Sequence, residues 1–315
     1  MTKVLVTGAT GFIGAPLSQA LSERNFIVMR TARHARDEVK SMPLDTENWK
    51  PALEGVDVVV HCAALAHVPA QSDDAFREKV RTLNVTAAQR LARQAKELGV
   101  KRFIFLSSVK AIGESTAANQ VYTCESQCLP EDLYGESKRE AEVALQQELS
   151  GSETDLVIIR PPLVYGPGVK GNFKSLMNIA KRNLPLPFKS VDNKRSLVAL
   201  DNLVDLIVTC VKYPESLNDT FLVSDDHDVS TRELLDSLTK AYGNEPRLWP
   251  YPVSFMRVAA RLLGKKAVAD RLFGNLQLDI SYTRRTLNWE PVVSFEQGIQ
   301  DCVTTEFNNS NQDKG

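Results

Sequence analysis

A tyrosine and a lysine stand four residues apart, as Tyr134 and Lys138, in a segment whose pattern predicts a helix. Side chains four residues apart lie on the same face of a helix, so the phenol and the ammonium group are neighbours. A phenol titrates at about pH 10 in water, and a neighbouring cation favours the phenolate and lowers that pKa. We therefore expect Tyr134 to exchange a proton at neutral pH while Lys138 also holds a polar ligand group.

Two hydroxyl side chains, Ser107 and Ser108, follow an apolar run that predicts a buried strand. The carboxyl ends of strands in open α/β sheets border the crevice in which such proteins bind ligands. A serine at this edge can donate a hydrogen bond to a substrate oxygen next to the predicted phenol. The two segments together indicate acid–base chemistry at one edge of a sheet.

A glycine-rich loop, TGATGFIG at residues 7–14, follows the first predicted strand and opens the first predicted helix. Its glycines are spaced Gly-x-x-Gly-x-x-Gly, which allows a tight turn and a close approach of the backbone to a pyrophosphate. The helix N-terminus after the loop supplies N–H groups and a positive dipole to phosphates. Because this loop lies between a strand and a helix, it predicts a dinucleotide site.

Apolar runs alternate with amphipathic stretches in the first half of the chain, which indicates βαβ units and a parallel sheet. We expect strands over residues 3–7, 26–31, 57–61, 102–107 and 156–160. We expect helices over residues 12–24, 73–98 and 133–149. The fold class is thus α/β, a Rossmann-type doubly wound parallel sheet over residues 1–165. A smaller α/β lobe that binds substrate is expected over residues 166–315, with some segments returning to the sheet.

The composition excludes several classes of function. The chain has 38 basic and 39 acidic side chains and a net charge of −1, so nothing in the overall charge favours nucleic acid or a membrane surface as a partner. No stretch approaches the roughly 18 apolar residues of a membrane span. Five cysteines without an export signal predict reduced thiols in the cytosol. Cys124 and Cys128 have no second pair at ligand spacing, so no metal is predicted.

The chain resembles the extended short-chain dehydrogenases/reductases of the nucleotide-sugar branch, the NAD-dependent epimerase/dehydratase family. The resemblance covers nearly the whole chain. It is carried by TGATGFIG at 7–14, HCAA at 61–64, NVT at 84–86, the serines followed by Gly113, PEDLYGESK at 130–138 and RPPLVYGPG at 160–168.

The resemblance assigns roles to individual residues. The catalytic set that it implies is Ser108, Tyr134 and Lys138. The cofactor-binding set is Gly8, Thr10, Gly11, Phe12, Ile13, Gly14, Arg33, Asp45, Ala63, Ala64, Asn84, Tyr134, Lys138 and Pro161. The substrate-binding set is Ser108, Asn172, Phe173, Arg195 and Arg271, and the two arginines would hold the diphosphate of a UDP-sugar.

The choice of cofactor depends on the end of the second predicted strand. A carboxylate there binds the ribose of NAD, whereas a basic residue accommodates the 2′-phosphate of NADP. The chain has Arg30 and Arg33 in this region and no acid before Asp37. NADP(H) is therefore favoured, and NAD(H) is the alternative.

Enzymes of this branch catalyse three reactions on the hexose of a nucleotide sugar: 4,6-dehydration, 4-epimerisation and 4-keto reduction. Dehydratases carry a Thr-Asp-Glu set where this chain has Ser108-Val109-Lys110, which argues against dehydration. The segments SSVKAIGE at 107–114 and RLFGNL at 271–276 resemble bacterial UDP-4-keto-6-deoxy-N-acetylhexosamine 4-reductases of O-antigen pathways. A 4-keto reductase that uses NADPH is thus the main expectation, and a UDP-hexose 4-epimerase with tightly bound NAD is the alternative.

Two alternative functions agree less well with the sequence. A reductase of sterols or flavonoids would need no arginine for a diphosphate, so Arg195 argues against it. A non-catalytic NADP sensor would have no need of the intact Ser108, Tyr134 and Lys138.

His61 is expected to be packed in the core, and His67 to lie on a loop near the crevice. The family resemblance also implies a homodimer through the two long predicted helices.

Overall fold

A seven-stranded sheet in which every pair of neighbours is parallel forms the centre of the molecule. A computed structural model describes residues 1–35, 38–66, 68–69 and 72–312, and only the backbone of 309–312. The strand order is β3-β2-β1-β4-β5-β6-β9, and the order reverses between β1 and β4. The bounds are β1 (Lys3–Thr7), β2 (Ile27–Ala32), β3 (Val39–Ser41), β4 (Val58–His61), β5 (Arg102–Leu106), β6 (Asp155–Arg160) and β9 (Asp219–Leu222). This confirms the Rossmann-type doubly wound sheet.

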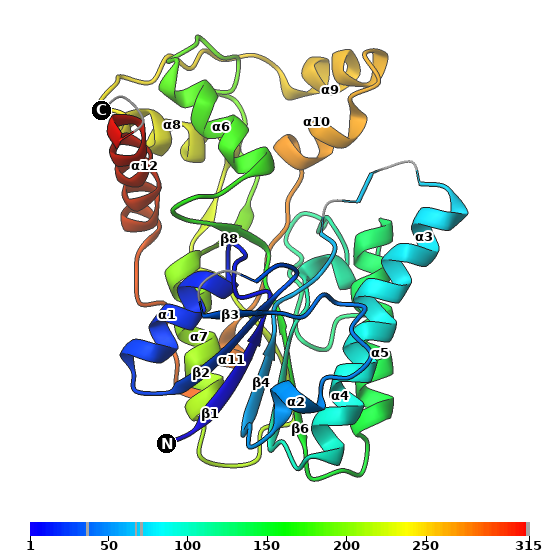
Figure 1. The fold of residues 1–315 in the computed structure, drawn as a ribbon. Helices are drawn as coiled ribbons and strands as arrows, with labels where there is room; N and C mark the ends of the chain where they lie inside the picture. The colour runs from blue at the N-terminus through cyan, green and yellow to red at the C-terminus, as the bar shows by residue number, and fades with distance from the viewer. Residues whose placement is uncertain (36–37, 67, 70–71, 313–315) are drawn as a thin grey trace.

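Helices cover both faces of this sheet (Figure 1). They are α1 (Gly14–Glu23), α2 (Lys50–Leu53), α3 (Asp74–Arg81), α4 (Ala87–Glu97), α5 (Leu133–Leu149), α7 (Leu200–Lys212) and α11 (Ser281–Leu287). Side chains that alternate along β1 enter two separate cores: Val4 and Val6 pack with α1 and α7, and Leu5 packs with α4 and α5. Strands buried on both faces explain the continuous apolar runs in the sequence.

The helix expected over residues 73–98 is interrupted in the structure. Helix α3 is followed by a π-helical turn, Thr82–Thr86, before α4 begins. The Ala87 amide bonds to the Thr82 carbonyl, five residues back. Within the turn, Asn84 directs its amide side chain to the Leu65 backbone. A π-bulge of this kind is frequent at functional sites, and helical periodicity in the sequence does not reveal it.

The short strand β7 and most of the chain after residue 166 build a second layer above the carboxyl ends of the strands (Figure 1). It contains a three-stranded sheet of order β10-β8-β7. The elements are β7 (Leu163–Tyr165), β8 (Arg195–Ala199), β10 (Asp228–Val229), α6 (Gly171–Lys181), α8 (Thr231–Ala241), α9 (Val253–Leu262), α10 (Lys266–Phe273) and α12 (Phe295–Gln312). Strand β9 and helix α7 pack against the main sheet instead. The domain division at residues 165 and 166 stays a prediction.

No helix within the described ranges combines the length and the apolar character needed to cross a membrane.

Candidate active site

The glycine loop places its three glycines where larger residues do not fit. Gly8 has a φ of +68°, and a Cβ there would lie 3.0 Å from the Ala63 backbone. A Cβ on Gly14 would lie 2.2 Å from the Gly8 carbonyl oxygen. Gly11 donates its N–H to the same oxygen at 2.8 Å, which closes the turn. Thr10 and Gly11 are exposed above the N-terminus of α1, so the loop suits a pyrophosphate.

The end of β1 is tied to the end of β4 beside this loop. The Thr7 hydroxyl lies 2.8 Å from Nδ1 of His61, and it accepts the Ala63 amide at 3.3 Å. His61 is 1% exposed, as expected for a packed residue. Burial, together with the Lys138 charge, lowers the pKa of His61 to about 3. Residues Ala63 and Ala64 follow directly and remain partly exposed at the sheet edge. His67 lies outside the described residues.

Helix α5 carries the predicted tyrosine–lysine pair, and its bounds are those expected from the sequence. Asp132 caps the helix by accepting the Gly135 amide at 2.8 Å. The Lys138 ammonium is 2% exposed and donates to the Leu106 carbonyl at 2.8 Å. Its Nζ lies 5.8 Å from the centroid of the Tyr134 ring. The pair thus lies at the carboxyl end of β5. The neighbouring strand is β4, whose carboxyl end is tied to the end of β1 beside the glycine loop.

The expected lowering of the tyrosine pKa is not found in this structure. Burial raises the pKa of the Tyr134 phenol, and the nearby Asp132 carboxylate raises it further. Burial also lowers the pKa of Lys138 to about 8, against the opposing effects of Cys62 and Glu142. The ammonium is directed to the Leu106 carbonyl, so loss of hydration outweighs its attraction for a phenolate. In this state Tyr134 is a protonated donor at neutral pH.

The two adjacent serines have different environments. Ser107 is 3% exposed, and its hydroxyl donates to Glu142 at 2.6 Å in the core. Ser108 is half-buried and accepts the Lys110 amide at 3.2 Å. An accepting hydroxyl of this kind can donate its own proton to a substrate oxygen. The geometry therefore favours Ser108 for contact with substrate, in agreement with the count back from Gly113.

Asn84 is buried and fully engaged with its surroundings. Its Oδ1 accepts the Leu65 amide at 2.7 Å. Its Nδ2 donates to the Leu65 carbonyl at 3.2 Å and to the Ser137 hydroxyl at 3.0 Å. The side chain thus joins the π-turn to the helix that carries Tyr134 and Lys138. Pro161 lies across the same edge, where its carbonyl accepts the Val109 amide at 2.9 Å.

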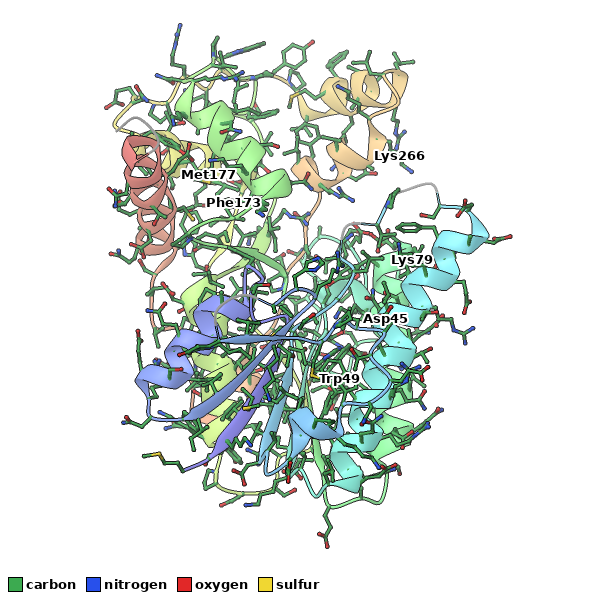
Figure 2. All side chains as sticks on the ribbon, in the orientation of Figure 1. Asp45, Trp49, Lys79, Phe173, Met177 and Lys266 are labelled. Carbon is green, nitrogen blue, oxygen red and sulfur yellow. The ribbon has the colours of Figure 1, made fainter. Side chains whose placement is uncertain are left out.

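The two arginines near the end of β2 differ in how freely they can meet a ligand. Arg30 pairs with Glu38 at 2.9 Å and donates to Ser22 at 2.9 Å. Arg33 follows the strand and is exposed. Asp45 is also exposed, beyond β3, where its carbonyl accepts a hydrogen bond from Arg90 of α4 at 3.3 Å, and Figure 2 labels it beside this helix. Of the two arginines, Arg33 is the better placed for a cofactor phosphate.

The structure brings the two predicted substrate arginines together around an acidic residue that the sequence analysis did not single out. Arg195 donates to the Gly274 carbonyl at 3.2 Å, next to the segment that carries Arg271. Burial lowers the pKa of Arg195, Glu114 opposes this, and Arg271 adds to it. Nε of Arg271 lies 3.8 Å from the Glu114 carboxylate. Two guanidinium groups near one another suit a diphosphate, and Glu114 pairs with one of them, Arg271.

The acidic residue is linked to the tyrosine helix by a lysine. Nζ of Lys110 lies 2.9 Å from Glu114 and 2.5 Å from Asp132, the N-cap residue of α5. Burial tends to raise the pKa of Asp132, but the hydrogen bonds from Lys110 and the Gly135 amide outweigh it and lower that pKa. Lys110 lies in a short 3-10 turn, Val109–Ala111, and Glu114 lies beyond it, so helical spacing in the sequence did not indicate this contact.

Asn172 and Phe173 were both expected to contact substrate, but they have different environments in the structure. Asn172 is exposed at the start of α6. Phe173 is fully buried and stacks on Tyr165, with ring centroids 5.2 Å apart. Figure 2 shows Phe173 and Met177 on the inner side of α6. The Phe173 side chain therefore belongs to the core of this lobe and offers no surface to a substrate here, which corrects the sequence-based role.

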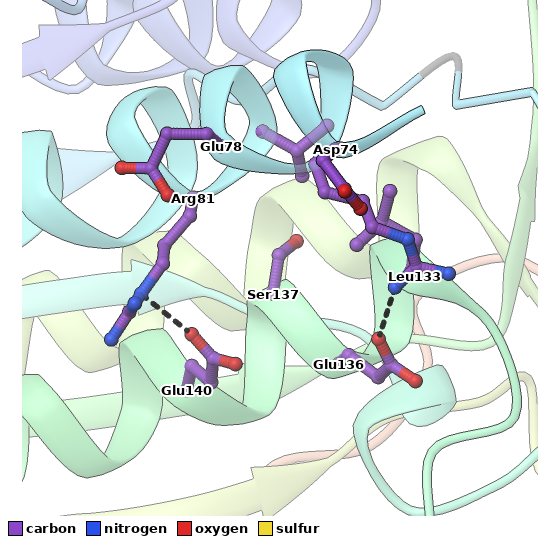
Figure 3. Close-up of a pocket in the computed structure, with 9 residues that line it drawn as sticks. Asp74, Glu78, Arg81, Leu133, Glu136, Ser137 and Glu140 are labelled. Carbon is purple, nitrogen blue, oxygen red and sulfur yellow. Dashed lines mark ion pairs between the residues drawn. The ribbon is translucent and has the colours of Figure 1, made fainter. Parts of the chain in front are cut away.

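A charged pocket between α3 and α5 lies apart from these residues (Figure 3). Its walls carry the ion pairs Arg77–Glu136 at 3.8 Å and Arg81–Glu140 at 3.4 Å. Tyr134 and Lys138 do not line it. Opposite charges already paired across the pocket are typical of contacts that hold two helices together. We therefore place the reaction site at the sheet edge and not in this pocket.

A phosphate loop beside a tyrosine–lysine pair is typical of dinucleotide-dependent oxidoreductases, and comparisons with known proteins agree. The model of the NAD dependent epimerase/dehydratase family matches residues 4–223. The chain is 42% identical over 318 residues to a UDP-glucose 4-epimerase of Vibrio cholerae, covering 98% of this chain and 97% of that protein. It is 25% identical over 340 residues to a 3β-hydroxysteroid dehydrogenase/Δ5→4-isomerase of Mycobacterium tuberculosis, covering 96% and 89%.

Solved structures show the same fold. A UDP-glucose 4-epimerase from Thermotoga maritima with UDP-glucose superposes with a TM-score of 0.78 at 21% identity, covering 98% of this chain and 100% of that chain. A UDP-glucuronic acid 4-epimerase from Bacillus cereus in complex with NAD gives a TM-score of 0.78 at 19% identity, covering 98% and 99%. The chain belongs to the NAD-dependent epimerase/dehydratase family of short-chain dehydrogenases/reductases, as the sequence motifs predicted.

Proposed function

We propose that this protein is an NAD-dependent 4-epimerase of a UDP-hexose. The observation that carries the proposal is the 42% identity, over nearly the full length of both chains, to a UDP-glucose 4-epimerase. The geometry supports it, because Ser108, Tyr134 and Lys138 lie at the same edge as the glycine loop. Relatives solved with NAD favour that cofactor over the NADP(H) expected from the second strand.

Each part of the site has a role in this proposal. A nicotinamide cofactor supplies reversible hydride transfer at C4 when bound. Tyr134 takes the proton of the C4 hydroxyl in one half of the reaction and returns it in the other. Ser108 holds the C4 oxygen, and Lys138 orients the tyrosine helix and the cofactor ribose. Arg195 and Arg271 bind the diphosphate, which positions C4 against the phenol.

A 4-keto reductase of a UDP-4-keto-6-deoxy-N-acetylhexosamine is the second candidate. One observation favours it: an arginine, Arg33, and not a carboxylate follows β2. A reductase needs only the proton-donating half of the cycle. It would use NADPH and release the oxidised cofactor at each turnover.

One pair of assays distinguishes the candidates. Purified protein is mixed with UDP-galactose and catalytic NAD, and UDP-glucose is measured by chromatography. In parallel it is mixed with NADPH and UDP-4-keto-6-deoxy-N-acetylglucosamine, and loss of reduced nicotinamide is followed by absorbance. Conversion without net change in the cofactor supports the epimerase. Stoichiometric loss of NADPH without epimerisation rejects it in favour of the reductase.

The homodimer implied by the resemblance is also a proposal. Helices α4 and α5 lie side by side, with their inner residues in one core. Pairing of these helices across two copies would make a four-helix contact. Light scattering of the purified chain tests this, and a monomer mass at micromolar concentration would reject it.

A further inference from the structure

Helix α9 lies at the outer end of the second lobe (Figure 1). It exposes an apolar face. None of its residues is buried. Its inner side still makes contacts: Val253, Met256 and Ala260 pack toward a small core that contains Ala269 and Phe273 of α10. An ordinary surface helix has polar residues on the side opposite to such contacts.

The outer side of α9 is apolar as well. Phe255, Val258, Ala259 and Leu262 follow the spacing i, i+3, i+4, i+7 and so form one stripe. The exposed fractions of Phe255, Val258 and Leu262 are 63%, 54% and 83%, and that of Leu263 just beyond is 73%. Within the part of the chain that the structure describes, nothing covers this stripe.

Exposed apolar side chains are concentrated in this one region. Of seventeen exposed large apolar side chains among the described residues, seven lie between residues 249 and 268. Trp249 and Tyr251, which precede α9, have ring centroids 5.5 Å apart. We define the outer patch as Trp249, Tyr251, Phe255, Val258, Leu262 and Leu263. A contiguous apolar patch of this kind marks a binding surface.

The charged side chains around the outer patch are mainly basic. Residues 245–270 contain five basic side chains and two acidic ones, Glu245 and Asp270, in a chain whose net charge is −1. Arg261, Lys265 and Lys266 are exposed beside Leu262 and Leu263, and Figure 2 labels Lys266 at this end of the molecule. The overall charge balance therefore conceals a local basic excess.

The apolar outer patch and the basic residues beside it together favour an anionic surface as the binding partner. A second copy bound through the same patch would bring the basic residues of both chains together, which is unfavourable. Helices that lie in a membrane interface combine Trp, Phe and Leu on one side with Lys and Arg nearby. We propose that the outer patch binds the surface of an anionic membrane, with Phe255, Leu262 and Leu263 at the boundary between headgroups and acyl chains.

Helix α9 is joined to α10, the helix that carries Arg271 of the candidate active site. The proposed membrane contact does not depend on which reaction this site catalyses. Arg257 fixes α9 on α10, since it donates to the Phe273 carbonyl at 2.8 Å and pairs with Asp270 at 3.5 Å. Arg271 lies on the same helix α10. A protein bound through α9 would therefore hold its nucleotide-sugar site near the membrane surface.

Trp249 provides a direct spectroscopic test. It is 45% exposed, whereas the other two tryptophans, Trp49 and Trp289, are 1% and 4% exposed. The full chain is mixed with vesicles of phosphatidylcholine alone or with about 30% phosphatidylglycerol, and emission and flotation are measured. We expect a blue shift and co-flotation with the anionic vesicles only, reversed by about 0.5 M salt.

Variants then separate the apolar from the basic contribution. Leu262→Ser with Leu263→Ser should weaken vesicle partitioning about 100-fold, since two apolar side chains no longer insert. Lys265→Glu with Lys266→Glu should weaken it about 10-fold or more. Matched controls are Val292→Ser, an exposed apolar residue elsewhere, and Lys40→Glu with Lys212→Glu. Both controls should bind like the parent chain, and thermal unfolding checks that each variant is folded.

Three results would overturn the proposal. One is absence of binding to anionic vesicles. Another is equal binding to neutral vesicles, or binding that the patch variants retain. The third is a concentration-dependent dimer that Leu262→Ser with Leu263→Ser abolishes while vesicles fail to bind, which would assign the outer patch to a second copy.

Discussion

Glu142 binds the Arg160 guanidinium through two hydrogen bonds, of 2.8 Å to Nε and 2.7 Å to Nη2, one helical turn after Lys138. Glu142 is 0% exposed and Arg160 is 3% exposed. The same carboxylate accepts the Ser107 hydroxyl at 2.6 Å. This buried contact joins α5 to β5 and β6 directly behind the catalytic candidates, so it sets where the tyrosine helix lies against the sheet.

Removal of the Glu142 charge should destabilise the protein strongly. Glu142→Gln leaves a buried guanidinium without its counter-charge, which costs about 3–5 kcal/mol in the free energy of unfolding. Urea unfolding of both proteins measures this difference. Glu140→Gln on the same helix removes a partly exposed partner of Arg81 and should change stability by about 0.5 kcal/mol or less. Equal effects of the two variants would show that the buried pair is not structural.

Loss of the Tyr134 hydroxyl should abolish most activity and leave binding intact. Tyr134→Phe removes the proton donor and acceptor, so kcat should fall by about 10²–10⁴-fold. Isothermal titration with UDP should give an unchanged affinity. Tyr213→Phe, whose hydroxyl donates to the Thr286 carbonyl instead, is the matched control and should keep full activity. A Tyr134→Phe enzyme with near-parental kcat would remove this residue from the mechanism.

Two substitutions at the arginine pair and its acidic neighbour should change the affinity for UDP in opposite directions. Arg195→Ala loses a charged hydrogen bond to the diphosphate and should weaken UDP binding about 10- to 100-fold. Glu114→Gln removes the carboxylate that competes with the diphosphate for Arg271, so UDP should bind more tightly. Calorimetry with UDP measures both. Arg182→Ala, an exposed arginine after α6, should have no effect. Tighter binding by Arg195→Ala would contradict the proposed site.

Arg33 should affect NADP(H) and not NAD(H). The 2′-phosphate is the group that separates the two cofactors, so Arg33→Ala should lower affinity for NADPH about tenfold and leave that for NADH unchanged. Fluorescence titration of each reduced cofactor measures this. Arg24→Ala, which breaks a surface pair with Asp205, is the control. If Arg33→Ala leaves both affinities unchanged, the reductase candidate loses its main support.

Acid should destabilise the protein through His61. Its pKa is lowered to about 3 in the folded state from 6.5, so the unfolded chain binds more protons between these values and stability falls as pH decreases through that window. At pH 5 the expected loss relative to neutral pH is about 2 kcal/mol. Urea unfolding at pH 7.5 and 5 measures it. His61→Asn should reduce this pH dependence, whereas the exposed His34→Gln should retain it.

Features that depend on local sequence were predicted well. The bounds of α5, the strand β1 and the turn of the glycine loop depend on side-chain periodicity and on glycines within a few residues of one another. The facing positions of Tyr134 and Lys138 follow from helical geometry alone. The parallel, doubly wound arrangement followed from the βαβ pattern, because parallel strands need crossover connections, which helices supply.

Other features were decided only by the tertiary structure, because they join residues distant along the chain. Ser107 and Ser108 are neighbours in sequence, yet Glu142, thirty-five residues away, holds one of them in the core. Phe173 follows the exposed Asn172 in sequence, yet packing against Tyr165 buries it in the core of the second lobe. Glu114 and Arg271 meet only because two segments far apart in the chain cross above the sheet. Periodicity along one segment carries no information about the second segment that packs against it.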